Sequence, residues 1–201
     1  MTLAIDDDAL EAVARLLDRG GLAELSISAI AAEAGVSRVT LHRRGPSVDD
    51  YVVALMGRVS DELRAELWPT LTAATSGAVR LRQALGALCT IAERRGGVMQ
   101  ALYGMAGRPI PGDPERTTNM AFAEPFERLI RDGCLDGSLH SERPADDAPL
   151  LVNVVGWTYI QMRRAHGWPE AKITEAAIDL AMTRVAPPTQ PASGSQPEPH
   201  R

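Results

Sequence analysis

Residues 26–44 limit the possible folds of this chain more than any other part of the sequence. Alanines and isoleucines recur there at a helical spacing, Gly35 interrupts them, and Val36 and Leu41 continue the apolar pattern beyond it. Glycine permits the positive φ that a tight turn between two helices requires, and the small Ala31 lets those helices cross closely. The spacing therefore predicts a helix-turn-helix in which Val36 and Leu41 pin the second helix to the first.

A helical period of 3.6 dominates the whole chain, and no segment shows the convincing alternation of a half-buried strand. We therefore predict an all-α fold, with an N-terminal three-helix helix-turn-helix domain and a C-terminal helical regulatory and dimerisation domain. Ser26 and Ser37 are the expected N-caps of the two short helices, and Pro125 is expected to kink or break a later helix. The predicted helices span about residues 6–18, 27–34, 37–44, 47–68, 81–95, 98–106, 115–131, 145–166 and 170–185.

The same pattern sets the expected domain limits. Residues 1–46 form the helix-turn-helix domain, residues 47–186 form the larger helical domain, and residues 187–201, rich in Pro, Ser and Gln, form a disordered tail. The chain has no long run of apolar residues, and its N-terminus is acidic rather than basic. We therefore expect a soluble cytoplasmic protein with no signal peptide and no membrane partner.

The titratable residues favour no cofactor. Cys89 and Cys134 lie in apolar helical patterns, where buried free thiols are expected and a redox switch or metal site is the lesser alternative. The histidines lack the spacing of metal ligands, so no metal is predicted. Since a nucleophile elbow, a phosphate loop and an obvious catalytic carboxylate pair are also missing, we do not expect an enzyme. An all-helical enzyme stays as an alternative that only a screen for turnover would revive.

The second helix of the motif carries hydrogen-bonding residues near its start. Such a helix fits the major groove of DNA, with its N-terminal residues closest to the base edges. Ser37 can offer a hydroxyl and an amide to a phosphate, Arg38 can pair with guanine or phosphate, and Val39 can touch a thymine methyl. The formal net charge of −5 confines any such contact to a local patch. The expected DNA-binding residues are Ser26, Ser37, Arg38, Val39, Thr40, His42, Arg43 and Arg44.

Residues from about 10 to 55 resemble the N-terminal domain of the TetR/AcrR family of transcriptional regulators. The resemblance rests on residues 30–48, which read Ile-Ala-Ala-Glu-Ala-Gly-Val-Ser-Arg-Val-Thr-Leu-His-Arg-Arg-Gly-Pro-Ser-Val. It implies a homodimeric repressor that binds a double-stranded DNA operator through paired recognition helices. It also implies that a small-molecule effector of unknown identity binds the C-terminal domain and releases the protein from DNA.

Three positions depart from the family pattern. His42 stands where the family has tyrosine, Gly45 where phenylalanine is usual, and Val48 where lysine is common. Two acids, Asp49 and Asp50, follow directly, and acids outnumber arginines over the first fifty residues. The alternative function is therefore a ligand-binding protein of this fold whose head binds DNA weakly or not at all.

The last two predicted helices are the expected dimer interface. The helix over 145–166 is apolar on nearly all sides, and the next helix bears two apolar stripes. Both helices are either the core of one subunit or part of a bundle shared by two, and the second interpretation fits the dimer that paired recognition helices need. The expected interface residues are Val155, Tyr159, Met162, Ile173, Ala177 and Leu180.

An effector cavity is implied by the resemblance alone. Soft apolar and aromatic side chains in the larger domain are suited to line one, although each of them can equally be part of the core. The expected ligand-binding residues are Met99, Leu102, Tyr103, Met105, Phe122, Phe126 and Trp157.

Overall fold

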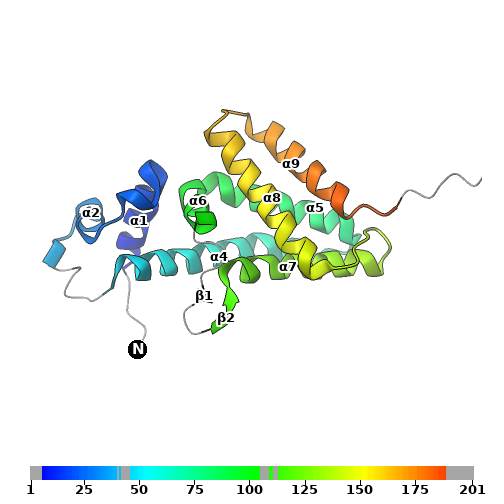
Figure 1. Cartoon of the computed structure of the whole chain (residues 1–201), viewed down its shortest axis with the longest axis horizontal. Helices are drawn as coiled ribbons and strands as arrows, with labels where there is room; N and C mark the ends of the chain where they lie inside the picture. Colours follow the sequence, from blue (N-terminus) through cyan, green and yellow to red (C-terminus); the bar gives the residue numbers. More distant parts are fainter. Residues whose placement is uncertain (1–5, 40, 42–45, 105–108, 111–112, 189–201) are drawn as a thin grey trace, which may run out of the picture.

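The computed structural model describes residues 6–39, 41, 46–104, 109–110 and 113–188 of the chain. Helices make up nearly all of its regular structure (Figure 1), which confirms the predicted all-α fold class. Residues 38, 39 and 41 are also helical, in the segment predicted for the recognition helix. The other elements are α1 (Asp7–Gly20), the 3-10 turn η1 (Gly21–Glu24), α2 (Ile27–Glu33), α4 (Val48–Thr72), α5 (Gly77–Arg94), α6 (Gly96–Gly104), β1 (Pro109–Ile110), β2 (Asp113–Thr117), α7 (Thr118–Leu135), α8 (Pro144–Arg164) and α9 (Glu170–Arg184).

The helices form a small head and a larger body that share the long helix α4 (Figure 1). In the head, α1 packs on α2 and on the first half of α4. In the body, α5 packs against α4, α7 and α8, while α8 also packs on α7 and α9. The short helix α6 lies between the two parts and contacts α1 and η1 on one side and α8 on the other. The head is therefore in direct contact with α6 and, through α6, is connected to α8.

A short antiparallel hairpin, which the sequence did not predict, precedes α7. Strand β1 pairs with β2, with Pro109 opposite Thr117. The helix predicted from about residue 115 therefore begins at Thr118. A two-residue strand is too short to show an alternating pattern, because its backbone is held by pairing with a neighbour rather than by its own side chains.

Three prolines of the described chain, Pro69, Pro125 and Pro149, lie inside helices without ending them. Helix α4 continues through Pro69 to Thr72, beyond the predicted end at residue 68. Helix α7 likewise continues through Pro125, so the predicted break is wrong for the described chain. Pro69 is tolerated because it falls in the last turn, where the loss of one backbone hydrogen bond affects little of the helix that follows.

One continuous apolar core runs from the head into the body. In the head it includes Leu17, Ile30, Leu41 and Leu55, each at most 2% exposed. In the body it includes Leu85, Phe126 and Tyr159, which are equally buried. Among the described helices, none combines the length and the hydropathy needed to cross a membrane.

Candidate DNA-binding and effector sites

The turn after α2 has the geometry that a helix-turn-helix requires. Gly35 has a φ of +68°, in the left-handed region that favours glycine. The Val36 amide donates to the Ala31 carbonyl at 3.0 Å, and the Gly35 amide donates to the Ala32 carbonyl at 3.3 Å. These two bonds form a Schellman motif, which ends α2 and turns the chain sharply. The predicted turn at Gly35 is confirmed.

The helix after this turn has a buried face and an exposed face. It begins after Ser37, whose carbonyl accepts the Leu41 amide at 3.3 Å. Leu41 is 1% exposed and belongs to the core, as predicted, whereas Arg38 is exposed and Val39 is 73% exposed. An aliphatic side chain so open to water gains from a partner that buries its methyl groups. The predicted contact residues Thr40, His42, Arg43 and Arg44, and also Gly45, lie outside the described residues.

The start of α2 is capped by Ser26, as predicted. The Ser26 hydroxyl accepts the Ala29 amide at 3.1 Å, and Ser26 itself is exposed. The cap satisfies one of the amides that the first turn of a helix leaves without a partner. Ser26 therefore fixes where α2 begins, and the short helix presents this end to solvent.

One acidic side chain pairs with two of the arginines in the head. Glu33, at the end of α2, accepts from Arg15 Nε at 2.6 Å and pairs with Arg19 on the next turn of α1. Hydrogen bonds from both guanidinium groups lower the pKa of Glu33 below its usual range. These contacts hold α1 to α2, and they reduce the positive potential that the head presents to a polyanion.

The start of α4 carries its own anion. The Ser47 hydroxyl accepts the Asp50 amide at 3.2 Å, and the Asp50 carboxylate accepts the Ser47 amide at 2.8 Å, which is a complete capping box. Hydrogen bonds from Ser47 lower the pKa of Asp50. A carboxylate thus occupies the start of α4, beside Val48, which stands where lysine is common in the family that the sequence resembles.

Ion pairs tie the first half of α1 to the body. Arg58 of α4 binds Glu11 at 2.9 Å and also pairs with Asp7. Arg95, between α5 and α6, binds Glu62 of α4 at 2.7 Å and Glu11 at 3.3 Å. The carboxylate of Glu62 raises the pKa of Arg95, because it stabilises the charged guanidinium. Glu11 is therefore shared by two arginines, Arg58 from α4 and Arg95 from the junction of α5 and α6.

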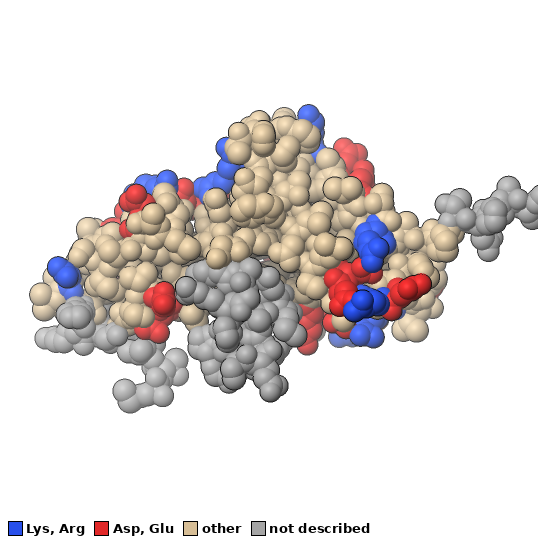
Figure 2. Space-filling model, viewed as in Figure 1, with Lys and Arg blue, Asp and Glu red and all other residues tan. Residues whose placement is uncertain are grey.

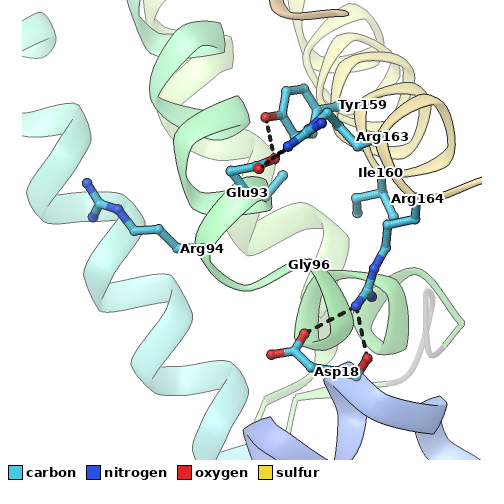
Figure 3. A pocket seen from close by; sticks show the side chains of 9 residues that line it. Asp18, Glu93, Arg94, Gly96, Tyr159, Ile160, Arg163 and Arg164 are labelled. Atoms are coloured by element: carbon cyan, nitrogen blue, oxygen red, sulfur yellow. Dashed lines mark hydrogen bonds and ion pairs between the residues drawn. The ribbon is translucent and has the colours of Figure 1, made fainter. Parts of the chain in front are cut away.

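A polar recess of about 320 Å³ lies where α5, α6 and α8 meet the end of α1 (Figure 3). On its body side, Tyr159 Oη donates to Glu93 at 2.7 Å and Arg163 Nε donates to the same carboxylate at 2.9 Å. The hydrogen bond from Arg163 is the main cause that lowers the pKa of Glu93 to about 2, and the hydrogen bond from Tyr159 adds to it. Within the described part of the chain, no cluster of His, Cys, Asp and Glu side chains is arranged to hold a metal ion.

The predicted effector residues take three different positions. Met99 and Phe126 are buried in the core, at 3% and 0% exposed. Tyr103 of α6 donates its hydroxyl to the Val152 carbonyl at 3.2 Å, and its ring meets the edge of Trp157 with centroids 5.5 Å apart. Phe122 is half-buried and borders a small hollow between α4 and α7, while Trp157 is 42% exposed. The side chains of Leu102 and Met105 lie outside the described residues.

The predicted interface residues fall mainly on the inner faces of α8 and α9. Val155, Tyr159, Ile173 and Ala177 are at most 2% exposed and pack within one subunit, so they are core residues here. Met162 is half-buried, and Leu180 is 59% exposed. A helical stripe that sequence analysis left out of the interface faces outward instead. It consists of Leu150, Val154 and Trp157, of which the first and last are 47% and 42% exposed.

This outward stripe had a signal in the sequence, namely its spacing of four and then three residues along one helix. Its neighbours Leu151, Val155 and Tyr159 show a similar spacing, and only packing against α5 and α7 distinguishes the two faces. In Figure 2 the surface over the middle of α8 is largely uncharged on the face in view, whereas charged side chains lie along α9. The weakly charged surface is therefore on α8, one of the two helices that were predicted to bind a second subunit.

Comparison with known proteins agrees with this architecture. Residues 9–47 match the sequence model of the family described as bacterial regulatory proteins, tetR family. No curated protein matches the chain by sequence. The match covers the complete motif from α1 through the turn at Gly35 to the start of α4.

Three solved structures show how far the fold extends. The TetR-family regulator PfmR of Thermus thermophilus is 18% identical, with a TM-score of 0.69 over 88% of this chain and 98% of its own. The repressor FadR of the same organism, solved with lauroyl-CoA, is 18% identical, with a TM-score of 0.64 over 94% and 99%. SmeT, the repressor of the Stenotrophomonas maltophilia multidrug efflux pump SmeDEF, is 17% identical, with a TM-score of 0.67 over 99% of both chains.

At such identities these likenesses concern the fold, and the match to the family model concerns the head. The matched segment contains the Schellman turn, the buried pin Leu41 and the exposed pair Arg38 and Val39. Residues 9–47 therefore resemble the tetR family of bacterial regulatory proteins, and the described chain has the fold of the TetR-family regulator PfmR over most of its length.

Proposed function

We propose that the protein is a homodimeric transcriptional repressor that binds operator DNA and is released by a small-molecule effector. The domain limits at residues 46 and 186 belong to this proposal, with the head reading DNA and the body binding the effector. The observation that carries it is the helix after Gly35, which buries Leu41 and exposes Arg38 and Val39. An exposed arginine beside an exposed valine suits a major groove, where guanine offers acceptors and thymine a methyl group.

Binding to the DNA that flanks its own gene tests this proposal. Fluorescence anisotropy with a labelled duplex is expected to show specific binding that a scrambled duplex of equal length does not compete. Arg38→Ala is expected to weaken binding by about tenfold or more, because one good arginine contact is worth about 1–3 kcal/mol. Arg64→Ala is the matched control, since Arg64 is an exposed arginine far along α4 that pairs with Asp61. Equal affinity for flanking and scrambled DNA would contradict operator recognition.

The dimer is proposed to form through the outward faces of α8 and α9. Leu150, Trp157 and Leu180 are large apolar side chains exposed to solvent in one subunit. A second copy related by a twofold axis would cover the same residues on both chains. Paired heads also need this arrangement, because two recognition helices must reach half-sites about one DNA turn apart.

The effector is proposed to bind the body among the aromatic and thioether side chains around α6 and α7. Tyr103 and Trp157 already meet edge to face there, and the structural relative FadR was solved with lauroyl-CoA. A ligand that favours one spacing of the heads would lower operator affinity by about 1–3 kcal/mol of coupling. A bound ligand that leaves operator affinity unchanged would contradict release by effector. Neither DNA binding nor effector binding, as proposed, involves a chemical reaction.

A second function, ligand binding without DNA recognition, is favoured by one observation. The capping box of Ser47 and Asp50 places a carboxylate at the start of α4, and Val48 supplies no cation there. Gly45→Phe combined with Val48→Lys separates the two functions. If the natural head is a weak DNA binder, the pair restores specific binding and steepens the salt dependence by about one unit of slope per added phosphate contact.

A further inference from the structure

Asp18, in the last turns of α1, joins three helices at the border of the recess in Figure 3. Its carboxylate accepts the Gly97 amide at 2.7 Å, so a side chain of the head caps the start of α6. Arg164, the last residue of α8, donates from Nη2 to the Asp18 carbonyl at 3.0 Å, with the carboxylate Oδ1 at 3.6 Å. The head is therefore bonded to α6 through a backbone amide and to α8 through a guanidinium.

The backbones meet closely at this point, and the contact depends on glycine. A Cβ atom on Gly97 would lie 2.4 Å from Asp18 Oδ1 and 2.6 Å from Asp18 Cα, which is closer than real contacts allow. The start of α6 can thus touch the end of α1 only because residue 97 has no side chain. Arg164 lies across the same junction and borders a second recess, next to Gln100 and η1.

The two arginines in the last turn of α8 bind different parts of the protein, one the body and the other the head. Arg163 binds Glu93 of α5, while Arg164 reaches Asp18 of α1. Figure 3 shows the two side chains leaving α8 in different directions. The end of α8 is thereby anchored to the body and bonded to the head at adjacent residues, near the helix C-terminus where cations are favoured.

This contact has a geometric consequence for α1. Asp7 and Glu11, in the first half of α1, are already tied to Arg58 and Arg95. Helix α1 is also packed on α2, α4 and α6, and the bond from Arg164 adds a polar restraint on its C-terminal half. Since α8 also carries the exposed apolar stripe proposed to meet a second subunit, the same helix would set both the subunit packing and the direction of the head.

We propose that Arg164 is a positioning residue, which couples the orientation of the DNA-binding head to α8 through Asp18. The inference rests on the proposed function only for its consequence on DNA. An isolated exposed ion pair contributes little, and the effect of Arg164 is instead on the freedom of α1. Loss of Arg164 is expected to loosen the head without unfolding the body.

Hydrogen exchange on the full-length protein tests the contact without DNA. In Arg164→Gln, the amides of residues 17–22 and 96–100 are expected to exchange about threefold faster, because local opening costs less free energy. Arg163→Gln is the matched control, since it removes the neighbouring guanidinium and leaves the head contact in place. Arg164→Lys is expected to recover part of the protection, and Asp18→Asn, which keeps an acceptor for Gly97, is expected to lose less than Arg164→Gln.

Operator affinity tests the consequence. On any DNA that the natural protein binds specifically, Arg164→Gln is expected to change affinity by about threefold or more while Arg163→Gln does not, in keeping with coupling by a non-contacting residue. Unchanged exchange in Arg164→Gln, or the same increase in Arg163→Gln, would overturn the inference. So would altered exchange with unchanged operator affinity. If the natural protein binds no DNA, the proposed function fails, and the exchange result alone decides whether Arg164 holds the head.

Discussion

Replacing Gly35 with alanine tests the backbone geometry on which the helix-turn-helix rests. Gly35 has a φ of +68°, and no atom lies within 4 Å of the position that a Cβ would take. The substitution therefore brings no clash, and its whole effect comes from the backbone. A left-handed conformation costs an L-residue about 1–2 kcal/mol. The reduced entropy of the unfolded chain returns about 0.4–1 kcal/mol of this. We expect a net loss of about 1 kcal/mol in the free energy of unfolding.

Gly57 provides a control with the same chemical change. It lies on the exposed side of α4, inside the helix, and a Cβ there would also meet no atom within 4 Å. Because alanine suits a helix interior better than glycine, Gly57→Ala is expected to stabilise the protein by about 0.5–1 kcal/mol. The two substitutions therefore have opposite predicted signs, although both add one methyl group in open space.

Urea unfolding followed by circular dichroism measures both variants. All proteins are compared at one concentration, because the stability of a dimer depends on it. A lower midpoint with an unchanged slope is expected for Gly35→Ala, and a higher midpoint for Gly57→Ala. Gly35→Asn should be milder than Gly35→Ala, since asparagine tolerates the left-handed region. A neutral or stabilising Gly35→Ala would refute the left-handed turn and with it the described crossing of the two helices.

Three further predictions follow from the body. Folding lowers the pKa of Glu93 to about 2 from an ordinary 4.5. The contribution of Glu93 to stability is therefore present above about pH 4.5 and is lost as the pH falls toward 2. In Glu93→Gln, the unfolding midpoint should consequently fall less steeply with decreasing pH than in the natural protein. Burial raises the pKa of the Cys89 thiol to about 12, so at pH 8 iodoacetamide should alkylate the half-buried Cys134 well before Cys89, and equal rates before unfolding would contradict the packing around α5. Trp157→Asp should turn the dimer into a monomer in light scattering, whereas Trp68→Asp, at a still more exposed tryptophan on α4, should not, and a dimeric Trp157→Asp would count against the α8 face.

Much of the fold could be predicted because its signals are local. A serine before an apolar stripe, as at Ser26, caps a helix through an amide three residues away. A glycine after a stripe, as at Gly35, permits the turn through its own backbone. The helix-turn-helix is therefore determined almost wholly by residues close together in the chain.

Tertiary packing decided the features that depend on distant partners. The sequence of α8 is apolar on two sides, and only contact with α5 and α7 makes Tyr159 a core residue while Trp157 faces outward. The bond between Arg164 and Asp18 joins residues far apart in the chain, and the spacing of residues in the sequence cannot predict such a contact. Local patterns fixed the cap at Ser26 and the turn at Gly35. Which face is buried, and which arginine reaches the head, follow only from how the helices pack.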